Sequence, residues 1–141
     1  MAPLANLVQR LRGRTPARAV DVDLTTRVGS VTLPNPVMTA SGTAGHGDEL
    51  GAYVDLDSLG AVVVKSLLDG PWPGNPAPRV HETPAGMINS VGLQGPGLEA
   101  WARDELPTLE RAGARVVVSI WGRSVDDYAR AAARCAELPE S

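Results

Sequence analysis

A single lysine stands out among the residues that could do chemistry. Lys65 is the only lysine, so the other 12 of the 13 basic residues are arginines. It follows directly after Ala61 to Val64, an apolar run that predicts a strand buried on both faces. A compact ammonium group at a strand end can pair with a ligand carboxylate or stabilise negative charge on a cofactor ring. We therefore interpret Lys65 as functional, with a surface lysine as the competing interpretation.

Two further stretches carry polar groups next to glycines. Ala40-Ser41-Gly42 follows an apolar segment, and its glycine lets the backbone approach a flat or phosphorylated ligand closely. A tight strand-to-helix turn would have the same pattern. The segment from Met87 to Gln94 places two amides and a hydroxyl in an apolar stretch. Amides suit the alternating carbonyl and N–H groups of a uracil-like ring edge, but a turn stabilised by Asn89 remains an equal alternative.

The composition argues against several functional classes. The 141 residues carry 13 basic and 16 acidic side chains, for a net charge of −3, and aromatic residues make up 4%. Nucleic-acid binding needs a basic groove with interleaved aromatic rings, so we expect no nucleic-acid partner. His46 and His81 have no Cys or His at ligand spacing, so we expect no metal. Cys135 lies on the apolar face of a predicted helix, which favours a core residue over a nucleophile.

The ends and the apolar runs of the chain predict its location. No segment is apolar over the roughly 18 residues that a membrane span needs, and the first residues lack the apolar stretch of a secretory signal. We therefore expect a cytoplasmic protein without a membrane span. Residues 1–20 hold four arginines and no acidic residue, which predicts a basic, poorly ordered arm before a folded unit over residues 21–141.

Apolar strands alternate with helical patterns along the folded unit. Thr26 to Leu33 predicts a β-hairpin around Gly29-Ser30, and Pro107 is expected to split an amphipathic helix. Ser124 is predicted to begin a further helix, with Asp127 three residues later. Strands are expected over residues 37–40, 61–65 and 115–120, with a short helix starting at residue 48. This order indicates βα units on a parallel sheet, which is an α/β fold.

In such a sheet, functional residues gather where the strands end. Ser41, Lys65, Ser66 and Ser119 all fall at predicted carboxyl ends of strands. We expect these side chains to lie at one edge of the sheet.

Several longer motifs occur in a recognisable order. They are Leu33-Pro-Asn-Pro-Val37, Ala40-Ser-Gly42, Val64-Lys-Ser66, Gly74-Asn-Pro-Ala-Pro-Arg79 and Met87-Ile-Asn-Ser-Val-Gly-Leu-Gln94. Over about residues 22 to 138 the chain resembles the class 1 dihydroorotate dehydrogenases. The resemblance implies an FMN-containing (β/α)₈ barrel, a TIM barrel, that oxidises dihydroorotate to orotate in pyrimidine (UMP) biosynthesis.

The resemblance also has implications for completeness and partners. A (β/α)₈ barrel needs about 200 residues or more, so the chain is expected to hold about half of one, its N-terminal portion, after the arm and hairpin. The catalytic base would lie beyond Ser141, and these residues alone would be inactive. The complete enzyme is expected to form a homo-oligomer and to pair with an iron–sulfur, FAD-containing electron-transfer subunit. The alternatives are another FMN barrel acting on a related dihydropyrimidine, and a non-catalytic half-barrel fragment.

The resemblance assigns roles to residues by motif. Lys65 would stabilise charge during catalysis and contact both flavin and substrate. The implied substrate-binding residues are Lys65, Asn89, Ser90, Val91, Gly92 and Leu93. The implied flavin-binding residues are Ala40, Ser41, Gly42, Lys65, Ser66 and Ser119.

Overall fold

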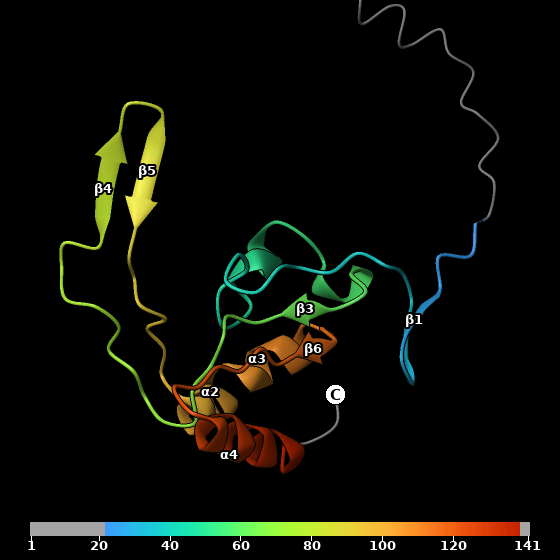
Figure 1. Cartoon of the computed structure of the whole chain (residues 1–141). Coiled ribbons are helices and arrows are strands. Elements are labelled where there is room, and N and C mark those ends of the chain that lie inside the picture. The colour runs from blue at the N-terminus through green and yellow to red at the C-terminus, as the bar shows by residue number, and fades with distance from the viewer. Residues whose placement is uncertain (1–21, 139–141) are drawn as a thin grey trace, which may run out of the picture.

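A small parallel sheet forms the centre of the chain, whose residues 22–138 are described by a computed structural model. Strand β3 (Val62–Val63) pairs in parallel with β6 (Val116–Val117), and parallel bridges join Met38 to Ala61 and Leu67 to Ile120. The three strand segments thus lie side by side in chain order (Figure 1). The predicted basic arm, residues 1–20, lies outside the described residues.

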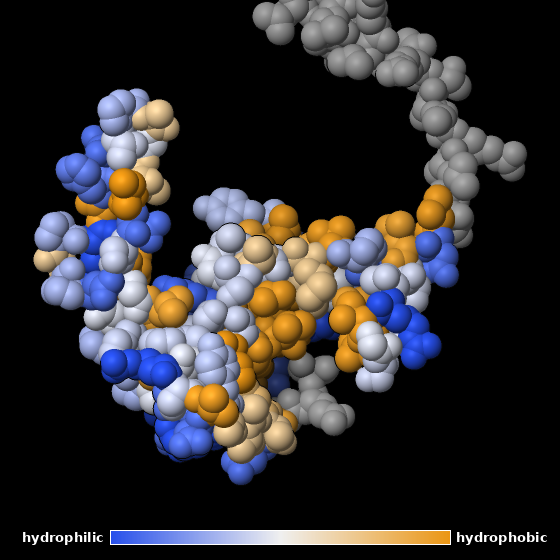
Figure 2. All heavy atoms as spheres, in the orientation of Figure 1, coloured by the Kyte–Doolittle hydropathy of each residue, from blue (hydrophilic) through white to orange (hydrophobic). Residues whose placement is uncertain are grey.

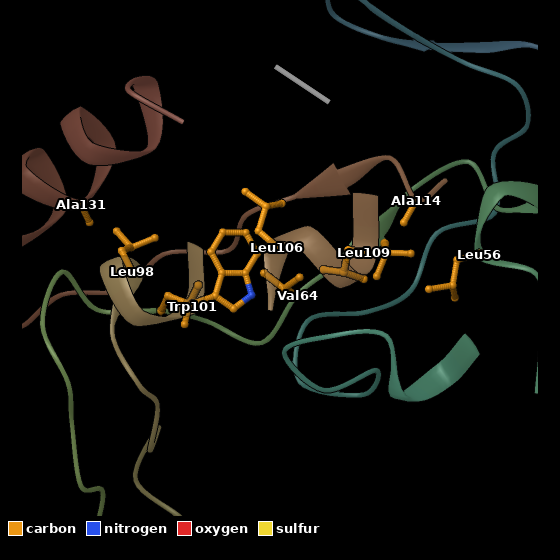
Figure 3. Close-up of a cluster of buried hydrophobic side chains, with 10 residues drawn as sticks. Leu56, Val64, Leu98, Trp101, Leu106, Leu109, Ala114 and Ala131 are labelled. Carbon is orange, nitrogen blue, oxygen red and sulfur yellow. The ribbon is translucent and has the colours of Figure 1, made fainter. Parts of the chain in front are cut away.

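Helices cover one face of this sheet. Val62 and Val64 are each 1% exposed and belong to a cluster that includes helical residues, and Figure 3 shows the Trp101 ring among Leu98, Leu106 and Val64. Between residues 22 and 138, the other face has less cover: Val117 is 41% exposed. The expectation that residues 61–64 form a strand buried on both faces is met except at Val63, which is half-buried. An apolar run indicates that both faces of a strand are apolar, but it does not identify what covers them.

Two short helices lie in the last part of the connection from β3 to β6. They are α2 (Leu98–Asp104) and α3 (Leu106–Arg111), separated at Glu105. Pro107 lies in the first turn of α3, where its missing N–H breaks no helical hydrogen bond. The predicted split of the helix is confirmed.

The last helix, α4 (Val125–Ala136), begins as predicted. The Ser124 hydroxyl accepts a hydrogen bond from the Asp127 N–H at 3.2 Å, and the Asp127 carboxylate accepts one from the Ser124 N–H at 3.0 Å. This reciprocal pair satisfies N–H groups that the first turn of a helix leaves free. Ala131, which is fully buried, places α4 against the common core.

The predicted N-terminal hairpin is present. Strand β1 (Thr26–Val28) pairs antiparallel with β2 (Val31–Leu33), and Gly29 has a φ of +61°. The segment after the first strand contains two 3₁₀ helices, η1 (Glu49–Ala52) and η2 (Leu56–Ser58), where a short helix was expected.

A second hairpin was not predicted from the sequence. Strand β4 (Val80–Thr83) pairs antiparallel with β5 (Gly86–Asn89), and together they project away from the helices (Figure 1). Apolar side chains lie on its surface, as Figure 2 shows, and they include Met87 and Ile88. The hairpin lies within the Pro- and Gly-rich connection between β3 and α2.

Candidate functional site at the carboxyl edge of the sheet

Three serine hydroxyls form a row at the carboxyl edge of the sheet. The Ser66 Oγ lies 2.8 Å from the Ser119 Oγ and 3.3 Å from the Ser41 Oγ. The Ser41 hydroxyl also donates to the Val64 carbonyl at 3.0 Å. These residues come from three separate parts of the chain, and they meet because parallel strands end at the same edge. The predicted convergence of the three serines is found in the structure; we call them the serine row.

The backbone beside the serine row is open. Gly42 has a φ of +83°, and a Cβ atom added to it would have no neighbour within 4 Å. Ala40 and Ser41 are exposed. A flat ligand could therefore approach the main chain of residues 40–42 without displacing a side chain.

Lys65 is half-buried next to this edge. Its backbone N–H donates to the Gly45 carbonyl at 2.9 Å, which ties β3 to the loop after the first strand segment. Its side chain lines an open hollow of about 550 Å³. The other lining residues are His46, Trp72, Gln94, Gly95, Pro96 and Glu105. A half-buried lysine that lines a hollow favours the functional interpretation over that of a surface lysine.

The hollow is also lined by His46, whose backbone is anchored to the core. The His46 carbonyl accepts a hydrogen bond from the Trp101 indole N–H at 2.7 Å, so α2 anchors this residue. Burial, together with the positive charge of Lys65, lowers the pKa of His46, against a smaller opposite effect of Glu49. The neutral imidazole is thus favoured beside the lysine.

The predicted substrate segment is held by a neighbouring motif. The Asn75 side-chain amide donates to the Ser90 carbonyl at 3.1 Å and to the Ser90 hydroxyl at 2.7 Å. The Asn75 backbone N–H donates to the Val91 carbonyl at 3.0 Å. The Arg79 guanidinium donates to the Gln94 side chain and, at 2.9 Å, to the Pro73 carbonyl. The motifs Gly74–Arg79 and Met87–Gln94, noted separately in the sequence, are therefore structural partners.

The two sets of predicted site residues are not fully brought together. Asn89 ends β5 opposite Val80, is exposed, and does not line the hollow at Lys65. Only the far end of its segment, at Gln94 and Gly95, reaches that hollow. The predicted flavin residues thus converge in the described chain, whereas the predicted substrate residues other than Lys65 begin on the projecting hairpin.

Cys135 does not lie in this site. It lies on α4 and packs against the buried cluster, where burial raises the pKa of its thiol. Within residues 22–138, no three His, Cys, Asp or Glu side chains are grouped so that they could hold a metal ion. In the same range, no helix has the length and apolar character that crossing a membrane requires.

Comparison with known proteins identifies the family. The family model described as dihydroorotate dehydrogenase matches residues 23–140. The chain belongs to the dihydroorotate dehydrogenase family. It is 55% identical over 112 residues to the "Dihydroorotate dehydrogenase B (NAD(+)), catalytic subunit" of Desulforudis audaxviator, covering 79% of this chain and 36% of that protein. The subunit of the same name from Alkaliphilus metalliredigens is 50% identical over 107 residues, covering 76% and 35%.

The coverage and the structural similarity define how much of the family's architecture this chain contains. The chain spans about a third of the length of these relatives, which is consistent with the expected partial barrel. The structure of ligand-free dihydroorotate dehydrogenase from Eimeria tenella matches with a TM-score of 0.53 and 22% identity, covering 89% of this chain and 40% of that one. The predicted family and the α/β class are confirmed.

Proposed function

We propose that this chain provides the N-terminal part of an FMN-dependent dihydroorotate dehydrogenase with a (β/α)₈ barrel. The complete cytoplasmic enzyme would oxidise dihydroorotate to orotate in pyrimidine biosynthesis. The serine row beside Lys65 carries the proposal, because it places polar groups at the sheet edge where α/β folds bind ligands. The names of the relatives support the reaction.

The residues at this edge have the chemistry that a flavin mononucleotide needs. Hydroxyls donate and accept hydrogen bonds, the backbone at Gly42 is open, and Lys65 offers positive charge next to the row. When bound, FMN would accept the hydride that the substrate loses. We assign its contacts to Ala40, Ser41, Gly42, Lys65, Ser66 and Ser119.

The remaining residues of this chain would bind and orient the substrate. Oxidation to orotate removes a proton from one ring carbon and a hydride from its neighbour, leaving a double bond between them. We assign the ring edge to the segment Asn89–Leu93 and the substrate carboxylate to Lys65, whose charge can balance it. The thiol of Cys135 packs against the core on α4, so we assign proton removal to a residue outside the described range.

The relatives' names also suggest partners. Both are called catalytic subunits, which implies that a second subunit works with them. We propose that the complete enzyme is a homo-oligomer that passes electrons to an iron–sulfur, FAD-containing subunit.

Spectroscopy of the full-length gene product tests the proposal. The protein is purified with its partner subunit, and its visible spectrum is recorded before and after anaerobic addition of dihydroorotate. We expect bound FMN whose absorbance is bleached by dihydroorotate and not by dihydrouracil. Bleaching by dihydrouracil alone would favour a related dihydropyrimidine as substrate. A reading frame that ends at Ser141 and yields protein without flavin would favour a non-catalytic fragment.

A further inference from the structure

A strained turn lies in the middle of the proposed substrate segment. Gly92 has a φ of +77°, and Leu93 has a φ of +58°. Leu93 is the only non-glycine residue between residues 22 and 138 with a positive φ. A branched residue adopts this left-handed conformation at a cost in free energy, so the surroundings must hold it there. Because Leu93 itself is 45% exposed, burial of its side chain does not account for the conformation.

Trp72 holds this turn from both sides. Its indole N–H donates to the Gly92 carbonyl at 2.9 Å. Its backbone N–H donates to the Gly95 carbonyl at 2.9 Å, and its carbonyl accepts from the Gly95 N–H at 3.0 Å. Trp72 therefore forms hydrogen bonds on both sides of Leu93, and only the one to Gly92 uses its side chain.

The orientation of the Trp72 indole is itself supported. The Trp121 ring meets it edge-on, with ring centres 5.8 Å apart and an angle of 77° between the planes. The Arg123 guanidinium lies 5.3 Å from its ring centre, a cation–π distance. Both supporting residues belong to the loop that follows Ser119. The same loop therefore continues from the serine row and supports the indole that holds the substrate segment.

We propose that Trp72 is a positioning residue for the substrate, acting through its hydrogen bond to the Gly92 carbonyl. The inference rests on the proposed function, in which Asn89–Leu93 bind dihydroorotate. Without the indole N–H, the Gly92 carbonyl loses its donor and Leu93 is free to relax toward an ordinary backbone conformation. The segment then no longer presents its polar groups in one arrangement, so substrate affinity falls while the flavin site at the sheet edge is unaffected.

The test compares two substitutions of the same kind in the full-length enzyme. Trp72→Phe keeps an aromatic ring and removes the N–H. Tyr53→Phe is the matched control, because it also keeps an aromatic ring and removes one polar hydrogen, from a side chain that is 84% exposed. We measure kcat and KM for dihydroorotate, the dissociation constant of orotate from the change in the flavin spectrum, flavin content and the melting temperature.

For Trp72→Phe we expect KM and the orotate dissociation constant to rise about tenfold, with kcat and flavin content close to wild type. Tyr53→Phe should bind orotate as the wild type does. Equal losses in both variants, or a lower melting temperature with unchanged orotate binding, would overturn the positioning role. A wild-type enzyme that is not reduced by dihydroorotate would instead overturn the proposed function.

A second pair of variants tests whether Trp72 acts through the turn at Leu93. Leu93→Gly removes the cost of the left-handed conformation, so the turn depends less on its donor. In that background, adding Trp72→Phe should weaken orotate binding by less than about threefold, a smaller loss than in the native sequence. An undiminished loss would show that Trp72 does not act through this turn.

Discussion

The carboxyl edge of the sheet and the β4–β5 hairpin carry the two parts of the proposed site, and different forces position them. At the sheet edge the main chain dominates: the Leu67 N–H donates to the Ser119 carbonyl at 2.8 Å, and the Trp121 N–H donates to the Leu67 carbonyl at 3.0 Å. The segment that follows the hairpin has main-chain hydrogen bonds at Val91 and Gly95, and it depends in addition on the side chains of Asn75, Arg79 and Trp72.

This difference predicts different responses to substitution. Main-chain hydrogen bonds at the sheet edge remain when one side chain is removed. Substitutions of the side chains there should therefore change flavin binding and leave substrate binding unaltered. The segment after the hairpin also needs side-chain donors, so removing one of them should change substrate binding. Lys65 lies between the two and should affect both.

The largest effect is expected for Lys65→Arg, which keeps the charge. The guanidinium is a broad planar fork, and it would displace a ligand from a place shaped for a compact ammonium. We expect the rate of flavin reduction by dihydroorotate to fall about 10²–10³-fold, by analogy with the loss of one transition-state donor. Single-turnover bleaching of flavin-loaded enzyme measures this rate.

The reverse exchange provides the control for Lys65. Arg27→Lys changes an exposed residue of β1 and should leave the rate unchanged. If flavin reduction in Lys65→Arg is as fast as in the wild type, Lys65 is a surface lysine. It then does not connect the sheet edge with the substrate segment.

Asn89→Ala should show the substrate-side response. A buried ring edge left without its amide partner costs about 1–3 kcal/mol, so kcat/KM for dihydroorotate should fall roughly tenfold to a hundredfold. Flavin content should stay near that of the wild type. His81→Ala, which changes an exposed β4 residue opposite Ile88, is the control on the same hairpin. Loss of flavin with unchanged kinetics in reloaded enzyme would contradict the assignment.

Ser66→Ala should show the opposite response. It removes the middle hydroxyl of the serine row, and a neutral hydrogen bond contributes about 1 kcal/mol, so FMN should dissociate about fivefold more readily. Once loaded with flavin, the variant should keep its KM for dihydroorotate. Ser58→Ala removes an η2 hydroxyl that donates to the Asp55 carbonyl, and it serves as the control. If KM rises instead, the separation between the two regions is wrong.

The sequence predicted the sheet edge better than the hairpin, for physical reasons. Ser41, Ser66 and Ser119 each follow an apolar run, and parallel strands bring such positions together whatever the connecting loops do. The β4–β5 hairpin escaped prediction because its strands lie among many prolines and glycines between residues 68 and 97. In addition, Met87 and Ile88 are adjacent apolar residues that are both exposed, so β5 lacks the alternation of apolar and polar residues that indicates a strand.

The role of Trp72 could not be read from the sequence for a different reason. Its indole donates to a carbonyl twenty residues later, and its aromatic partner Trp121 lies in another βα unit. No local spacing indicates such contacts. For Asn75 and Arg79 the sequence did offer an indication. Both belong to the motif Gly74–Arg79, which shortly precedes the segment that they hold.

The smallest predicted effect concerns His46 and the pH dependence of stability. Burial and the charge of Lys65 lower the pKa of His46 in the folded protein. Just below pH 6.5, about the ordinary pKa of histidine, the unfolded chain therefore binds more protons than the folded protein. The stabilising contribution of neutral His46 is therefore complete above that value and is lost as the pH falls. When the pH is lowered from about 7.5 to 5.5, the melting temperature of His46→Gln should fall less than that of the wild type. We expect a difference of about 1–2 °C, because the imidazole is only partly buried. His81→Gln, at an exposed position, should follow the wild type; equal slopes in all three proteins would show that the imidazole at the sheet edge is not held neutral.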